Sequence, residues 1–242
     1  SPQGRLRRVS GWLDRLAAEI TIRRTAASDR PFLIALAGGV ASGKSTVAKA
    51  LAARLRKDGR SVQVVAVDGF LFANAELAAR GLMDRKGFPD SYDWERLDCF
   101  LAEARAGTAR LTVPTYSHAA YDVDTDLSFA RPDVLILEGL IALQDRIGPV
   151  DLGLYLEADE DDLIAWYVER FMALERWDAP RLDDRLAEVG GDPEALAGDI
   201  WARINAPNLH RYIAPTRTRA DMVLLKDTHH QIRVLDQAAR AG

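Results

Sequence analysis

An eight-residue glycine-rich motif is the clearest sign of chemistry in this sequence. Residues 38–45 read Gly-Gly-Val-Ala-Ser-Gly-Lys-Ser, which fits the pattern G-x-x-x-x-G-K-[ST]. The glycines permit a tight turn in which successive backbone N–H groups face one point, and the positive end of a following helix strengthens the field there. In such a loop the lysine, Lys44, contacts the β- and γ-phosphates during catalysis, and the hydroxyl of Ser45 ligates Mg²⁺. We therefore predict that a nucleotide is bound by Gly38, Gly39, Val40, Ala41, Ser42, Gly43, Lys44, Ser45 and Thr46.

Two carboxylates end apolar runs at positions where phosphoryl transfer would need them. Asp68 follows the run 62–67, and Glu138 follows the run 134–137. Transfer of a phosphoryl group to an alcohol requires an acceptor for the hydroxyl proton and an acid near the metal ion. We predict Asp68 as the proton acceptor and Glu138 as a metal ligand. The alternative for Asp68, the first residue of an Asp-Gly pair, is a turn residue or a helix cap.

One arginine interrupts an apolar helix face. Apolar side chains recur at helical spacing between residues 160 and 176, at Leu163, Tyr167, Phe171 and Leu174. Arg170 falls within this stripe. A guanidinium in such a place is either paired in a salt bridge or directed at an anion. Beside an ATP site, the second interpretation is favoured, and Arg170 is predicted to stabilise the phosphoryl group during its transfer.

Strand-like and helix-like segments alternate around these side chains. Short apolar runs typical of buried strands occupy 32–37, 62–67, 134–137, 152–156 and 222–225. Helical patterns occupy 9–20, 46–56, 74–80, 94–106 and 160–176. Such alternation predicts an α/β fold of the P-loop NTPase type, with a mostly parallel sheet covered by helices on both faces. Ligands bind such sheets at the carboxyl ends of the strands.

The chain length suits one such domain. A chain of 242 residues is long enough to bury well over half of its unfolded surface in a single α/β domain. We predict a single kinase-like domain over 1–242, with a helical segment at 1–30 that precedes the first strand. The stretch 176–193 holds Gly190, Gly191 and many charged residues, and it is the best candidate for a mobile lid.

Composition argues against several classes of protein. No apolar stretch approaches the ~20 residues that a membrane helix needs. The net charge of −4 offers no general footprint for nucleic acid. The single cysteine, Cys99, cannot form a disulfide within the chain and falls in an amphipathic helical pattern, so we expect it in the core. We also expect a reducing, cytoplasmic location, because no signal peptide precedes the first helical pattern.

Several longer segments resemble one known family. The run Asp68-Gly-Phe-Leu-Phe-Ala-Asn-Ala-Glu-Leu-Ala-Ala-Arg-Gly-Leu-Met-Asp-Arg-Lys-Gly-Phe-Pro-Asp-Ser-Tyr-Asp93 is similar to the signature of bacterial type I pantothenate kinases, the P-loop enzymes that begin coenzyme A synthesis. The likeness continues through residues 113–123, 135–139, 166–171, 204–209 and 215–220, in order. It covers most of residues 32–230.

The resemblance implies a reaction and a set of binding residues. It implies ATP- and Mg²⁺-dependent phosphorylation of pantothenate to 4′-phosphopantothenate, with Asp68 as the catalytic base and Arg170 on the phosphoryl group. By the same resemblance, pantothenate is held by Tyr116, His118, Tyr167 and Asn208. Lys226 and His230 fall where the family has residues around the adenine. Members of the family are homodimers, so the resemblance also implies a homodimer here.

Departures from the family pattern concern the acceptor end of the site. Leu174 stands where the family has phenylalanine, and Ala206 where it has tryptophan; the segment after Glu175 is shortened and lacks aromatic residues. Coenzyme A is the family's feedback inhibitor, and these losses predict that it inhibits weakly. A related P-loop kinase acting on a nucleoside, a sugar or a sugar phosphate is the alternative.

A GTPase switch is a different class with the same phosphate loop. It would normally carry Asn-Lys-x-Asp for guanine, and no such tetrapeptide occurs in the sequence. Residues 145–148 do fit the loose pattern D-x-x-G, which means little without the guanine motif. The sequence therefore favours a kinase with a small-molecule acceptor.

Overall fold

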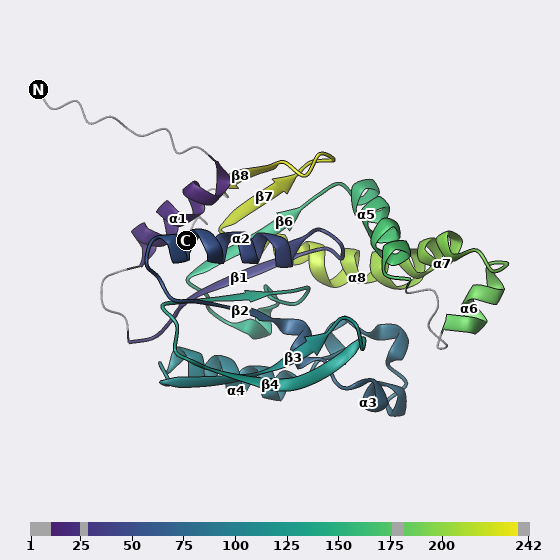
Figure 1. The fold of residues 1–242 in the computed structure, drawn as a ribbon, viewed down its shortest axis with the longest axis horizontal. Helices are drawn as coiled ribbons and strands as arrows, with labels where there is room; N and C mark the ends of the chain where they lie inside the picture. Colours follow the sequence, from purple (N-terminus) through teal and green to yellow (C-terminus); the bar gives the residue numbers. More distant parts are fainter. Residues whose placement is uncertain (1–10, 25–28, 176–181, 237–242) are drawn as a thin grey trace, which may run out of the picture.

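A six-stranded, mostly parallel sheet forms the centre of the molecule (Figure 1). The computed structural model describes residues 11–24, 29–175 and 182–236. The strand order is β2-β5-β1-β6-β7-β8, and only the last pair is antiparallel. The strands of this sheet are β1 (Phe32–Gly38), β2 (Val62–Ala66), β5 (Val134–Glu138), β6 (Leu152–Glu157), β7 (Met222–Lys226) and β8 (Ile232–Asp236). All five predicted strands are confirmed, whereas β8 had not been predicted.

Helices cover both faces of the sheet, as predicted. The side chains of β1 alternate between the two faces, because successive strand residues point in opposite directions. The buried side chains form two core clusters, one on each face. Ile34 belongs to the smaller cluster, with side chains of α1 and α2, and Ala35 belongs to the larger core cluster, with side chains of α4, α5 and α7. The helices are α1 (Trp12–Arg23), α2 (Lys44–Lys57), α3 (Asn74–Ala79), α4 (Trp94–Arg105), α5 (Glu160–Ala173), α6 (Asp183–Glu188), α7 (Pro193–Ile200) and α8 (Ala206–Asn208).

A separate hairpin lies beside the sheet and was missed in the sequence. Strands β3 (Arg110–Ser117) and β4 (Asp122–Ala130) pair antiparallel, and most of β4 is exposed. The hairpin approaches the turn after β2 closely. A Cβ atom on Gly69 would lie 2.1 Å from the carbonyl oxygen of Pro114, so only glycine fits there. This close approach brings β3 next to Asp68.

The region between α6 and β7 is almost wholly helical. Two π-helical turns, Trp201–Asn205 and Leu209–Ile213, flank α8 and continue the course of α7. This run packs against α5 at one end of the molecule (Figure 1). Within the stretch predicted as a lid, residues 176–181 lie outside the described part, α6 is a short helix, and α7 begins at Pro193. The lid therefore stays a prediction.

Two expectations from composition can be compared with the structure. Cys99 was predicted in the core, but its side chain is exposed on α4, so that prediction was wrong. The apolar face of α4 is formed by Leu97, Phe100, Leu101 and Ala104, which is why the amphipathic pattern alone misplaced the cysteine. Within the described ranges, no helix is both long and apolar enough to cross a bilayer.

A partly buried carboxylate links the start of β6 to β1. Asp151, just before β6, accepts two hydrogen bonds from the Arg30 guanidinium, at 2.7 and 2.8 Å, and one from the Leu33 N–H at 2.7 Å. Burial acts to raise the pKa of Asp151, but these hydrogen bonds outweigh it, so the pKa lies below its ordinary value. The carboxylate therefore stabilises the folded state in its charged form.

Asp151→Asn should lower the free energy of unfolding by about 1–3 kcal/mol at pH 7, because it removes the charge that these donors need. A depressed carboxyl pKa contributes stability that is fully present above the unfolded value and is lost as pH falls through the folded value. The difference between variant and wild type should thus shrink below about pH 4. Thermal unfolding at pH 7 and pH 3 measures it, with Asp145→Asn, an exposed ion-pair carboxylate, as the control. Equal losses in both variants would contradict the assignment.

Candidate active site

The glycine-rich motif forms a loop between β1 and α2, as predicted. Gly43 is the residue before α2 and has a φ of 96°, a left-handed conformation that favours glycine. The Lys44 ammonium folds back and donates a hydrogen bond of 2.7 Å to the Gly39 carbonyl oxygen. The backbone N–H groups in the first turn of a helix have no partner within the helix, so an anion is favoured at the start of α2, beside this loop.

A buried carboxylate meets the first turn of α2. The Ser45 hydroxyl donates a 2.7 Å hydrogen bond to Glu138 Oε1, and Glu138 is only 6% exposed. Burial raises the pKa of Glu138, an effect that the nearby Lys44 and Ser45 oppose. Burial likewise lowers the pKa of Lys44, against the charges of Glu138 and Asp68. Both groups are thus desolvated, and a polyphosphate with a divalent cation would compensate both charges.

The oxygen atoms of Ser45 and Glu138 fit a Mg²⁺ ion better than a transition metal. Mg²⁺ takes oxygen ligands and is commonly held by one or two carboxylates together with substrate phosphates. Ser45 and Glu138 supply one hydroxyl and one carboxylate oxygen at the phosphate loop. Across the residues with assigned positions, no group of three or more His, Cys, Asp or Glu side chains could hold a metal ion.

Strand register brings Asp68 to the same edge of the sheet. Glu138 is opposite Leu36 on one side and Ala66 on the other, and Asp68 follows Ala66 by two residues. A tight turn at Val67–Phe70 then leads the chain away. Asp68 lies close enough to Lys44 for its charge to act on the pKa of that lysine. The structure thus brings together the phosphate loop and both predicted carboxylates.

The four side chains predicted to bind the acceptor line one hollow together with this chemistry. Tyr116 comes from β3, His118 from the turn directly after β3, Tyr167 from α5 and Asn208 from α8. The hollow measures about 240 Å³. Its walls include Lys44, Ser45, Asp68, Glu138, Arg170, Tyr116, His118, Tyr167 and Asn208. A molecule held by Tyr116 and Tyr167 would therefore lie beside the Asp68 carboxylate and the phosphate loop.

Asn208 has one amide atom engaged and one available. Its Nδ2 donates a hydrogen bond of 2.9 Å to the Gly87 carbonyl oxygen. Its Oδ1 is buried and has no hydrogen-bond partner among the described residues. The Nδ2 atom of Asn205, three residues earlier, is buried in the same condition and lines the same hollow. Buried amide atoms are normally paired, so these two groups suit a polar ligand that supplies an acceptor and a donor.

The stripe on α5 is partly as predicted. Leu163, Tyr167 and Phe171 are buried, but Leu174 is 52% exposed because α5 ends at Ala173. The prediction that Leu174 belongs to the apolar face was therefore wrong. Arg170 is exposed and lines the hollow with Lys44, and its charge adds to the effect of burial in lowering the pKa of that lysine. Its position is compatible with an anion between the two cations.

Lys226 and His230 lie on the other side of the phosphate loop. The Lys226 ammonium donates a 2.8 Å hydrogen bond to the Ser42 carbonyl oxygen and sits 4.0 Å from the centre of the Trp166 ring. The His230 ring packs on the same tryptophan, with 4.7 Å between ring centres. Trp166 thus joins α5 to the end of β7 and the turn after it. No role had been assigned to Trp166 from the sequence.

Lys86 and Tyr92 near Asp68 were not singled out in the sequence. The Lys86 ammonium lines the hollow, donates to Asn74 Oδ1 at 2.7 Å, and lies 4.0 Å from the centre of the Tyr121 ring. The Tyr92 hydroxyl donates to Asp68 Oδ1 at 3.2 Å. Both residues belong to the segment 68–93, which carries the family resemblance. Their contacts could not be predicted from the sequence because they depend on the folding of the chain.

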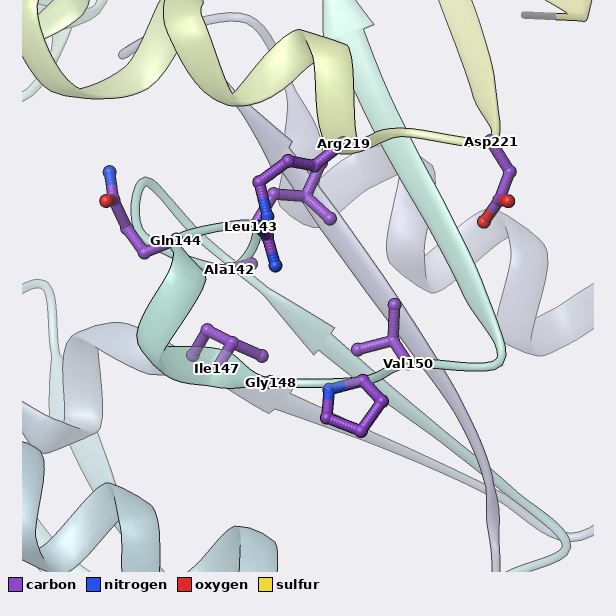
Figure 2. A pocket seen from close by; sticks show the side chains of 9 residues that line it. Ala142, Leu143, Gln144, Ile147, Gly148, Val150, Arg219 and Asp221 are labelled. Atoms are coloured by element: carbon purple, nitrogen blue, oxygen red, sulfur yellow. The ribbon is translucent and has the colours of Figure 1, made fainter. Parts of the chain in front are cut away.

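A second hollow, shown in Figure 2, lies beside the segments that lead into the amino ends of β6 and β7. Arg219 and Asp221 reach it from the segment that precedes β7. Arg219 is paired with Asp145, and Asp221 accepts a hydrogen bond of 2.7 Å from the Gly153 N–H. These charged groups are used within the protein, and the phosphate loop is at the other end of the strands. We therefore take the first hollow as the candidate active site.

Comparison with known proteins finds similar proteins along most of this chain. Residues 33–232 match the model of the phosphoribulokinase/uridine kinase family. The pantothenate kinase of Sorangium cellulosum is 46% identical over 222 residues, which cover 85% of this chain and 72% of that protein. The pantothenate kinase of Clavibacter michiganensis is 43% identical over 222 residues, with 85% and 70% covered.

The fold itself recurs in a solved structure of low sequence identity. Phosphoribulokinase from Rhodobacter spheroides superposes with a TM-score of 0.63 at 15% identity, over 88% of this chain and 82% of that one. This likeness concerns the P-loop kinase fold alone. The family model and the two relatives show that the chain is a P-loop kinase of the phosphoribulokinase/uridine kinase family and, within it, a member of the pantothenate kinase family.

Proposed function

We propose that this protein phosphorylates pantothenate with ATP, giving 4′-phosphopantothenate and ADP. The observation that carries the proposal is the single hollow that joins the phosphate loop and Asp68 to Tyr116, His118, Tyr167 and Asn208. An acceptor with a carboxylate, hydroxyl groups and a secondary amide offers polar partners to all four side chains. The buried Oδ1 atom of Asn208, which has no partner among the described residues, supports a substrate that carries a hydrogen-bond donor at this position.

The proposed reaction moves one proton and one phosphoryl group. The acceptor hydroxyl loses its proton to Asp68 while its oxygen bonds to the γ-phosphorus. The bond from that phosphorus to the β–γ bridging oxygen breaks, and its electron pair leaves with ADP. Lys44 holds the β- and γ-phosphates, and Arg170 stabilises the charge on the phosphoryl oxygens in transit.

Mg²⁺ and the nucleotide base have their own proposed positions. Ser45 and Glu138 would hold the ion, which supplies charge neutralisation at the phosphates. Lys226 and His230, packed against Trp166, would lie around the adenine. We further propose a homodimer located in the cytoplasm. Support for the homodimer comes from the family resemblance of the sequence. Support for the location comes from the single cysteine, which cannot form a disulfide within the chain.

A nucleoside, a sugar or a sugar phosphate is the second candidate acceptor. The match over residues 33–232 to a family named for phosphoribulokinase and uridine kinase favours it. The two candidates differ in what they offer to Asn208 and the aromatic wall. Pantothenate presents an amide and apolar methyl groups there, whereas a sugar presents hydroxyl groups.

ATP turnover by the purified protein should rise with pantothenate and stay near background with uridine, ribulose 5-phosphate or fructose. Coupled detection of ADP measures each rate at saturating MgATP, and mass spectrometry identifies the phosphorylated product. The aromatic and amide side chains of the hollow are the physical reason for the preference. A higher kcat/KM for one of the other acceptors would replace pantothenate as the substrate but retain the kinase.

Asp68→Asn should reduce turnover by about 10²–10⁴-fold, because it keeps the shape of the side chain and removes its basicity. The dissociation constant for MgATP, measured by titration calorimetry, should change little. Asp126→Asn, which alters an exposed aspartate paired with Arg96, is the matched control and should retain normal turnover. Near-normal turnover in the Asp68 variant would return that residue to the role of a turn residue.

Coenzyme A should inhibit this protein weakly. Leu174 is exposed and Ala206 is small at positions where the resembled family has aromatic rings. Each lost ring removes apolar contact worth about 1–3 kcal/mol. Inhibition constants measured against ATP should therefore be high, and the double variant Leu174→Phe, Ala206→Trp should lower them. Strong inhibition of the unaltered protein would show that other side chains replace these contacts.

A further inference from the structure

A buried tyrosine stands directly behind the proposed base. Tyr92 is only 2% exposed, and its hydroxyl donates to Asp68 Oδ1 at 3.2 Å. Burial, followed by the adjacent Asp68 carboxylate, raises the pKa of Tyr92 well above its ordinary value, so the hydroxyl keeps its proton and acts as a donor. The direction of the hydrogen bond is therefore fixed: tyrosine to carboxylate.

Backbone hydrogen bonds hold Tyr92 in this place. The Phe72 N–H donates to the Ser91 carbonyl oxygen at 3.0 Å, and the Asp93 N–H donates to the Phe70 carbonyl oxygen at 2.7 Å. Between them, Leu71 and Tyr92 form an isolated antiparallel bridge. The segment that carries Tyr92 is thus fastened to the chain that immediately follows Asp68. A shift of the base would have to move both segments together.

The tyrosine ring and its hydroxyl have separable roles. The ring belongs to the larger core cluster, and its centre lies 6.4 Å from that of Trp94. A phenylalanine ring would fill the same space. A buried hydroxyl, in contrast, costs free energy unless it has a hydrogen-bond partner. Its partner here is Asp68, so the oxygen atom is the part of Tyr92 that concerns the active site.

We propose that Tyr92 is a positioning residue for the proposed base: its hydroxyl holds Oδ1 of Asp68, so that Oδ2 faces the hollow and receives the proton of the acceptor hydroxyl. This inference rests on the proposed role of Asp68. Placing one oxygen fixes the rotation of the carboxylate about its Cβ–Cγ bond, and proton transfer depends on that orientation. The charges of Lys44 and Glu138 also act on this carboxylate, whereas the hydrogen bond from Tyr92 engages one named oxygen, Oδ1.

Tyr92→Phe tests the inference because it removes one oxygen atom and leaves the ring. The variant should show a kcat about 10- to 100-fold lower, the loss expected for a hydrogen bond to a charged group, with KM for ATP and Tm close to wild type. Tyr155→Phe is the matched control. Tyr155 is 5% exposed on β6, also in the core cluster, and is not a partner of Asp68. Its kcat should remain at the wild-type value.

A double-mutant cycle separates this role from a structural one. If Tyr92 acts through the Asp68 carboxylate, then Tyr92→Phe combined with Asp68→Asn should be no slower than Asp68→Asn alone. A full further loss in the double variant, or wild-type kcat in Tyr92→Phe while Asp68→Asn is slow, would overturn the inference and leave the proposed reaction intact. Near-normal turnover of Asp68→Asn itself would instead overturn the proposed base, and the inference with it.

Discussion

The hydrogen bond from Ser45 to the buried carboxylate of Glu138 is the contact on which the site depends. It joins the first turn of α2 to the end of β5, two elements that are 93 residues apart in sequence. A carboxylate 6% exposed must be compensated locally, and the partners near it are the hydroxyl and the lysine of the phosphate loop. The same exclusion of water strengthens the attraction between Lys44 and a bound phosphate, because charges interact more strongly at a lower dielectric constant.

The fold was predictable where sequence patterns are local. The apolar runs of β1, β5 and β6 are buried nearly throughout, so composition alone marks them as central parallel strands. Strand β4 is different, because most of its side chains are exposed and its pairing with β3 replaces an apolar signal. Strand β8 was missed in the sequence for the same reason, because it is a short antiparallel edge strand whose described side chains are only partly buried or exposed. Patterns of hydrophobicity do not report strands that bury little.

The site was predictable where a residue type at a strand end is itself the signal. Asp68 and Glu138 stand out because charged residues follow apolar runs, and their common edge follows from parallel topology. Tyr92, Lys86 and Asn205 gave no comparable signal. Their roles arise from contacts between distant segments, such as the bridge between Leu71 and Tyr92. Cys99 shows the opposite error, since a helical pattern indicates a face only to within a residue or two.

The π-helical turn Trp201–Asn205 sets the rotational phase of α8, the helix that carries Asn208. A π turn accommodates one more residue than an α turn, so each one shifts every later side chain around the axis relative to a regular helix. One residue corresponds to about 100° of rotation in an α-helix. Deleting a single residue from Trp201–Asn205 would therefore turn Asn208 about a quarter of the way around the axis, away from the hollow that it now lines. Chain length in this segment is thus constrained as tightly as residue identity.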